Sequence, residues 1–188
     1  MSRAARVAAQ NAIEADPRAD KYRRYFAPYL TKSERLIWAG RSDARSTILT
    51  YGRVWFVSLP AMVLFWLVLP REGAWLIPFF VALGLTLGPL GAALVAHQTF
   101  FGLTERRALF LIHGAGRRRF EWMEIAGAKP WVATAPGGRG TVFIGNVGVR
   151  GVRHQPFADG YGNKGFWRIE KPEQVAALAQ RIAATWDG

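Results

Sequence analysis

The sequence VWFVSLPAMVLFWLVLPREGAWLIPFFVALGLTLGPLGAALVA, residues 54–96, decides the expected fold because its only charged residues are Arg71 and Glu72. A helix needs about 20 apolar residues to cross roughly 30 Å of hydrocarbon. Residues 74–96 provide 23 residues without a charge. Residues 54–69 provide 16, enough for about 24 Å of helix. The stretch therefore predicts a two-helix transmembrane hairpin with a tight turn at residues 70–73.

The distribution of charge predicts how this hairpin is oriented. The chain carries 25 Lys and Arg against 13 Asp and Glu, and its net charge of +12 is shared equally by residues 1–53 and 97–188. By the positive-inside rule, both termini are expected in the cytoplasm. Basic residues also suit nucleic acid, but here they flank the apolar stretch, where topology already requires them, so no nucleic-acid partner is expected. The absence of cysteine excludes disulfides, zinc–thiolate sites and thiol nucleophiles.

Residues 3–16 are alanine-rich and predict a helix, read either as a surface helix or as a docking helix. Basic and aromatic residues then alternate, a mixture that suits a membrane interface, although it could equally pack on another protein. The residues predicted at the membrane interface are Tyr22, Arg23, Arg24, Tyr25, Phe26, Arg53, Trp55 and Trp75. Farther along, Thr31 and Glu34 have the spacing of a capping box at the start of a helix.

Small residues follow one face of the second predicted span. Gly84, Gly88 and Ala92 recur at intervals of four, which allows another helix to approach closely. The contact is either between the two spans or with another membrane protein.

After residue 96 the pattern changes from helical to strand-like. Short β-branched and aromatic runs separated by turns predict strands at residues 99–104, 107–113, 118–123, 131–134, 141–144 and 166–169. Pro172 suits the first turn of a last helix, in which Val175, Leu178, Ile182 and Trp186 share one face. Residues 145–165 contain six glycines and predict a long loop or distorted strands.

Several motifs in this order resemble bacterial membrane-anchored proteins with a pleckstrin-homology-like (PH-like) domain. They are Glu-Arg-Leu-Ile-Trp-x-Gly-Arg at residues 34–41, Leu-Thr-x-Arg-Arg at 103–107, Gly-Thr-Val-Phe-Ile-Gly at 140–145 and Phe-x-Arg-Ile-x-x-Pro-x-x-Val at 166–175. The resemblance implies a small antiparallel β-barrel or sandwich closed by one C-terminal helix, and a location in the bacterial cytoplasmic (inner) membrane with both termini cytoplasmic. Some relatives help to assemble photosynthetic or respiratory membrane complexes. The expected domains are 1–33 (N-terminal helix and basic-aromatic segment), 34–53 (lead-in), 54–96 (transmembrane hairpin) and 97–188 (PH-like domain).

The chemistry of residues 97–188 favours binding over catalysis. His113 and His154 lack metal-ligand spacing, and no serine-nucleophile motif is present; no catalytic residue, metal or cofactor is expected. A guanidinium group can donate two hydrogen bonds to one phosphate or carboxylate group. The candidate contacts for lipid or another anion are therefore Arg106, Arg107, Arg117, Arg118 and Arg119. The sequence thus favours a non-enzymatic subunit or assembly factor of an integral membrane complex, with an anchor that binds anionic lipid headgroups as the alternative. A homo-oligomer is left open.

Overall fold

The computed structural model describes residues 13–45, 59–61, 63–64, 67, 76–114, 116–135, 139–147, 157–159 and 161–186. The chain forms two compact units, one of Met1–Ser42 with Gln98–Gly188 and one of Asp43–His97. The N-terminal segment and the C-terminal β-rich region, predicted from the sequence as separate domains, therefore belong to one folded unit. The second unit is an insertion between two neighbouring strands of the first.

The predicted transmembrane hairpin is wrong. The long helix of the second unit is α4, Leu76–His97, and within the described ranges no helix combines the length and the apolar character that crossing a membrane requires. Most of the expected first span, and Arg53, Trp55 and Trp75, lie outside the described residues. Average hydropathy along a sequence predicts a span, but it does not establish that a helix of sufficient length and apolar character forms there. The predicted inner-membrane location and cytoplasmic termini depended on those spans, and they are wrong on the same finding.

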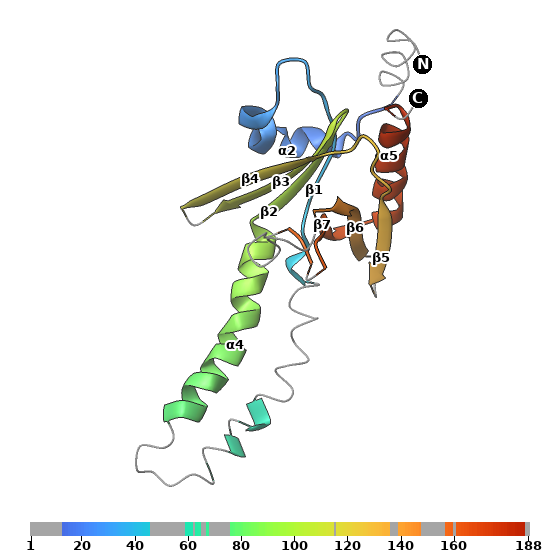
Figure 1. The fold of residues 1–188 in the computed structure, drawn as a ribbon. Coiled ribbons are helices and arrows are strands. Elements are labelled where there is room, and N and C mark those ends of the chain that lie inside the picture. The colour runs from blue at the N-terminus through green and yellow to red at the C-terminus, as the bar shows by residue number, and fades with distance from the viewer. Residues whose placement is uncertain are drawn as a thin grey trace. The chain divides into compact units, whose positions relative to one another are not determined.

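Four antiparallel strands form the first sheet (Figure 1): β1, Leu36–Arg41; β2, Thr99–Thr104; β3, Arg107–Gly114; and β4, Arg117–Glu124. They are arranged in the order β1-β2-β3-β4. The predicted strands at residues 99–104, 107–113 and 118–123 are confirmed. Strand β1 was not predicted, and it occupies the segment where the capping-box spacing had indicated a helix.

Three further strands form a second antiparallel sheet in the order β5-β6-β7. They are β5, Trp131–Ala135; β6, Arg139–Asn146; and β7, Asn163–Glu170. The last helix, α5, Pro172–Ala184, begins at the predicted proline and buries Val175, Leu178 and Ile182. Of the expected β-barrel or sandwich, the barrel is wrong, because no described strand of one sheet pairs with a strand of the other.

The main core lies between the two sheets and α5. Phe101 of β2, Phe110 of β3 and Phe166 of β7 are fully buried there, with ring centroids 5.3–6.2 Å apart. Successive residues of a strand point to opposite faces of the sheet, so the neighbouring residues Phe100, Leu109 and Leu111 point away from this core. They are nevertheless buried, which shows that the first sheet is covered on both faces.

The second cover is the N-terminal helix α2, Arg18–Phe26, followed by the 3-10 turn Ala27–Tyr29. Phe26 is fully buried against the sheet, and the Tyr25 ring stacks on Phe100 with centroids 4.4 Å apart. Tyr22 also contacts Phe100, at 5.9 Å. These aromatic rings, predicted at headgroup depth in a membrane, instead pack on the protein's own sheet, while Arg23 and Arg24 remain exposed.

Candidate functional site

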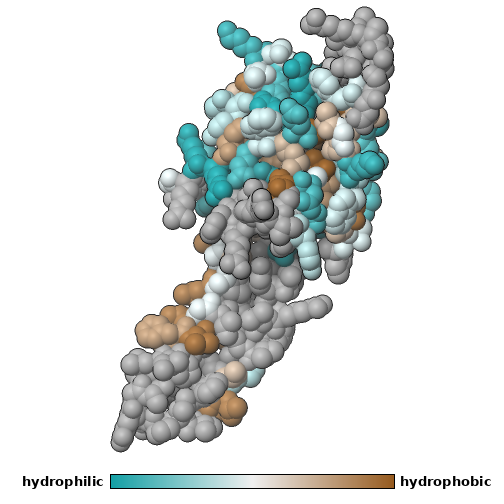
Figure 2. All heavy atoms as spheres, viewed as in Figure 1, coloured by the Kyte–Doolittle hydropathy of each residue, from teal (hydrophilic) through white to brown (hydrophobic). Residues whose placement is uncertain are grey.

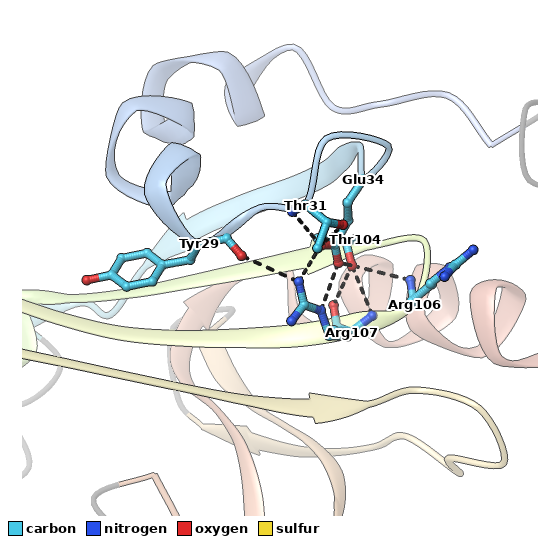
Figure 3. Close-up of polar contacts among 6 residues, drawn as sticks. All are labelled: Tyr29, Thr31, Glu34, Thr104, Arg106 and Arg107. Atoms are coloured by element: carbon cyan, nitrogen blue, oxygen red, sulfur yellow. Dashed lines mark hydrogen bonds and ion pairs between the residues drawn. The ribbon is translucent and has the colours of Figure 1, made fainter.

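A buried ion pair fixes the turn between β2 and β3 (Figure 3). Arg107 at the start of β3 donates from Nε to Glu34 Oε1 at 3.0 Å and from a terminal nitrogen to Glu34 Oε2. Thr104 at the end of β2 donates its hydroxyl to Glu34 Oε1 at 2.6 Å. The Glu34 side chain is only 3% exposed and that of Arg107 18%. Within this arrangement the carboxylate is held by charge-assisted bonds from two directions.

These bonds change the acidity of both partners. Burial disfavours the charged form of Glu34, but hydrogen bonds from Arg107, Thr104 and the Thr31 backbone, with the Arg107 charge, outweigh it and lower the pKa of Glu34 to about 2. The hydrogen bonds to Glu34 raise the pKa of Arg107 above its ordinary value, against the opposing effect of burial. Both groups are therefore charged at neutral pH.

Local sequence explains how Glu34 reaches this position. The Thr31 N–H donates to Glu34 Oε2 at 3.3 Å, and its hydroxyl does so at 3.2 Å. This is the contact predicted from the capping-box spacing, but it closes a turn before β1 rather than starting a helix. Arg35 beside it forms an ion pair with Glu105 at 3.3 Å. The motifs at residues 34–41 and 103–107 thus meet in space, and their charged residues pair across the gap.

An open cleft of about 350 Å³ lies beside this pair. Its lining includes the indole rings of Trp122 in β4 and Trp186 after α5, with the guanidinium of Arg106 5.4 Å from the Trp186 ring centroid. Trp122 is 49% exposed, and Arg107 lies 5.3 Å from its ring centroid. Glu124 completes the polar part of the lining. The cleft therefore offers two aromatic surfaces, one exposed cation and one exposed anion above a rigid ion pair.

The structure divides the five predicted arginines between two places. Arg107 is paired in register with Glu124, whereas Arg117 is paired with Gly114 at the other end of the β3–β4 ladder. Seven residues of strand separate the two ends, about 23 Å. Arg106 lines the cleft and points away from the Glu34–Arg107 pair (Figure 3). Arg118 and Arg119 are exposed near the hairpin tip, with Arg119 Nε 3.0 Å from Glu121.

Two of the three small residues predicted to pack against another helix, Gly84 and Gly88 of α4, face open space among the described atoms. A Cβ built on Gly84 or Gly88 meets nothing within 4 Å among the described atoms, and Ala92 is half-buried. The predicted close helix contact at these residues is therefore not seen within the described part of the chain.

Sequence reasoning missed the main members of the cleft. Trp122 sits on the exposed face of β4, where strand alternation places it opposite the inward-facing Glu121, and Trp186 was expected only to pack on the sheet. The alternation of β4 and an unusually large apolar residue at an outward position were the available signal for Trp122.

No group in the described part of the chain has the form of a metal site, since no three His, Asp or Glu side chains come together there. Comparison with protein-family models, curated protein sequences and solved structures gives no match. The PH-like resemblance therefore stays a prediction.

Proposed function

We propose that this chain is a non-enzymatic binding protein that serves as a subunit or assembly factor of a larger protein complex. The observation that carries the proposal is the open cleft, in which Trp122, Trp186 and Arg106 gather. Tryptophan and arginine are the residue types that contribute most often to binding energy at protein interfaces, because they bury large surfaces and still donate hydrogen bonds. The Glu34–Arg107 pair beneath them supports a preformed surface.

Two carboxylates whose pKa values are lowered, Glu34 and Asp159, support a structural rather than a catalytic use of these groups. Glu34 accepts hydrogen bonds on both oxygens and is ionised at neutral pH. Burial opposes ionisation of Asp159 as well, yet bonds from Asn163, Tyr161 and Gly162 lower its pKa. A general base needs a pKa near the operating pH and a free lone pair facing substrate. Both carboxylates are used instead to hold loops in place.

A second surface supports the same function. Helix α4 exposes apolar side chains over much of its described length (Figure 2), including Phe80, Leu87 and Leu94. Contiguous exposed apolar surface is typical of regions that bind another molecule. By contrast, the separation of Arg106 and Arg107 from Arg117–Arg119 argues against the alternative of one anionic-headgroup site built from all five.

A matched pair of substitutions tests the role of the cleft. Trp122 and Trp131 are both exposed, at 49% and 47%, but only Trp122 lines the cleft. We expect affinity capture of the tagged full-length chain from its native cells to yield a distinct partner protein. Trp122→Ala should lose that partner, and Trp131→Ala should keep it. Equal recovery with both variants, or no partner with the unmodified chain, would refute the proposal.

A further inference from the structure

Strand β4 is the last strand of its sheet. The order β1-β2-β3-β4 leaves one side of β4 paired with β3, and within the described ranges no strand pairs with its other side. The β3–β4 register runs without a shift from Arg107↔Glu124 to Gly114↔Arg117. Natural edge strands are usually protected by bulges, prolines or charged side chains. Strand β4, with the sequence RRRFEWME, has no bulge and no proline, and it carries charges of both signs, which a second β4 can pair.

The hydrogen-bond pattern shows which backbone groups face outward. Ile125 N–H donates to Arg106 O at 3.0 Å, one position beyond the Arg107↔Glu124 pair. Hydrogen-bonded pairs alternate along an antiparallel ladder, so the odd-numbered residues of β4 bond to β3. The even-numbered residues, Arg118, Phe120, Trp122 and Glu124, direct their N–H and C=O groups away from it. The bond from His113 N–H to Gln98 O, at 2.9 Å, gives the same alternation for β3.

The charged and aromatic side chains of these four residues are placed symmetrically about Glu121. Arg118 and Glu124 are exposed and lie three positions on either side of Glu121. Phe120 and Trp122 lie one position on either side, with Phe120 stacked on Tyr29 at 4.1 Å. When two identical strands of this kind pair antiparallel, the cation at one end of each strand lies opposite the anion at the other end of its partner.

We propose that β4 pairs with β4 of a second copy of this chain, antiparallel, about a two-fold axis at Glu121. In this register Arg118 lies opposite the partner subunit's Glu124. Phe120 lies opposite the partner subunit's Trp122, and symmetry repeats both pairs. Opposite charges and aromatic pairs directly across two strands are the favourable combinations in an antiparallel sheet. A two-fold interface of this kind is isologous and closed, so it yields a dimer rather than a fibre.

Other registers lose these pairs. The outward-facing groups can bond only when even-numbered residues lie opposite even-numbered residues. An axis at Phe120 or at Trp122 meets that condition but separates Arg118 from the partner's Glu124. With the axis at Glu121, that carboxylate approaches its own symmetry mate. Its charge is already compensated, because Lys164 Nζ lies 2.5 Å and Arg119 Nε 3.0 Å from it.

The same register relates the two ends of the β3–β4 hairpin to each other. It places the partner's Arg117 opposite Ile125 in register, so the hairpin tip of the second copy lies at the end of β4 that borders the cleft. The inference does not depend on the proposed function. It accounts for the arginines at the hairpin tip, which have no role in the cleft of their own chain.

The test is the molar mass of the purified full-length chain, measured by light scattering, with charge-reversed variants. The unmodified chain should have twice the mass of one chain. Arg118→Glu places two glutamates opposite each other and Glu124→Arg places two arginines, so each variant should dimerise about tenfold more weakly or worse. The double variant Arg118→Glu/Glu124→Arg should recover the dimer. Arg23→Glu, on exposed α2, is the control and should leave the mass unchanged.

Mixing the two single variants gives the sharpest result. In a mixed dimer, the glutamate introduced at position 118 of one chain would face the arginine introduced at position 124 of the other. The second pair would be Arg118 opposite Glu124, as in the unmodified protein. Two preparations that are monomeric alone should therefore form dimers when combined. Circular dichroism of each variant checks that it is folded.

A monomer at every concentration, or a dimer that survives both single reversals, overturns the β4 interface. Failure of the mixture to dimerise when both singles are folded monomers overturns the register. Trp122 belongs to both surfaces, but the mass of the purified chain and the capture of a protein of different sequence are separate measurements, so this inference and the proposed function can fail separately.

Discussion

At the scale of single residues, the structure depends on one carboxylate that keeps its charge inside the fold. Glu34 is ionised because Arg107, Thr104 and Thr31 supply the hydrogen bonds that water no longer provides. Removing one partner of a buried ion pair is costly because the other charge stays behind without compensation.

Replacing Glu34 with Gln should therefore lower the free energy of unfolding by about 3–5 kcal/mol. Urea denaturation of the full chain measures this change. Glu173→Gln on the exposed side of α5 is the control, and should change stability by less than about 0.5 kcal/mol. Equal effects of the two substitutions would show that the Glu34 pair contributes little.

The lowered pKa of Glu34 also predicts a dependence of stability on pH. The carboxyl has a pKa of about 2 in the folded chain and its ordinary value of 4.5 when unfolded. Its stabilising contribution is then fully present above pH 4.5 and is lost as the pH falls toward 2. Unfolding free energies measured across this range should fall less steeply for Glu34→Gln than for the unmodified chain. Parallel curves would contradict the assignment.

At the scale of elements, local patterns predicted the strands that pair with a neighbour in sequence. Strands β2, β3 and β4 are separated by short turns, so alternation and turn residues were enough to find them. Strand β1 was missed because its partner β2 lies beyond the whole insertion, and pairing over that separation leaves no local signal. The capping-box spacing at Thr31 was real, but a long-range strand determined the structure that followed it.

Strand pairing in the second sheet makes a prediction about two glycines. A Cβ at Gly165 of β7 would lie 2.4 Å from the Val142 carbonyl oxygen and 2.8 Å from Phe143 Cα, both backbone atoms. At Gly145 of β6 it would meet only the flexible Met123 side chain, at 3.2 Å. Gly165→Ala should lower the free energy of unfolding by about 1–3 kcal/mol or more, and Gly145→Ala by clearly less. Urea denaturation compares them, and the reverse order would contradict the β6–β7 register.

At the scale of the whole molecule, composition was a poor guide to the site. The number of basic residues suggested that Arg106, Arg107 and Arg117–Arg119 form one group, but such a number does not show which side chains each arginine contacts. The fold pairs Arg107 with Glu34, places Arg106 at Trp186 and puts the other three at the far end of a hairpin. The apolar stretch likewise predicted two spans from average hydropathy, and the helices of the described residues do not provide them.

We propose that a partner protein binds at the cleft beside Trp122. Photo-crosslinking in the native cells tests it most directly, with p-benzoylphenylalanine replacing Trp122 in one chain and the equally exposed Trp131 in another. From position 122 we expect a discrete crosslinked product that contains a protein of a different sequence, besides any product with a second copy of this chain through β4, and we expect no product with that protein from position 131. A product from position 131 alone, or the same product from both, would contradict it.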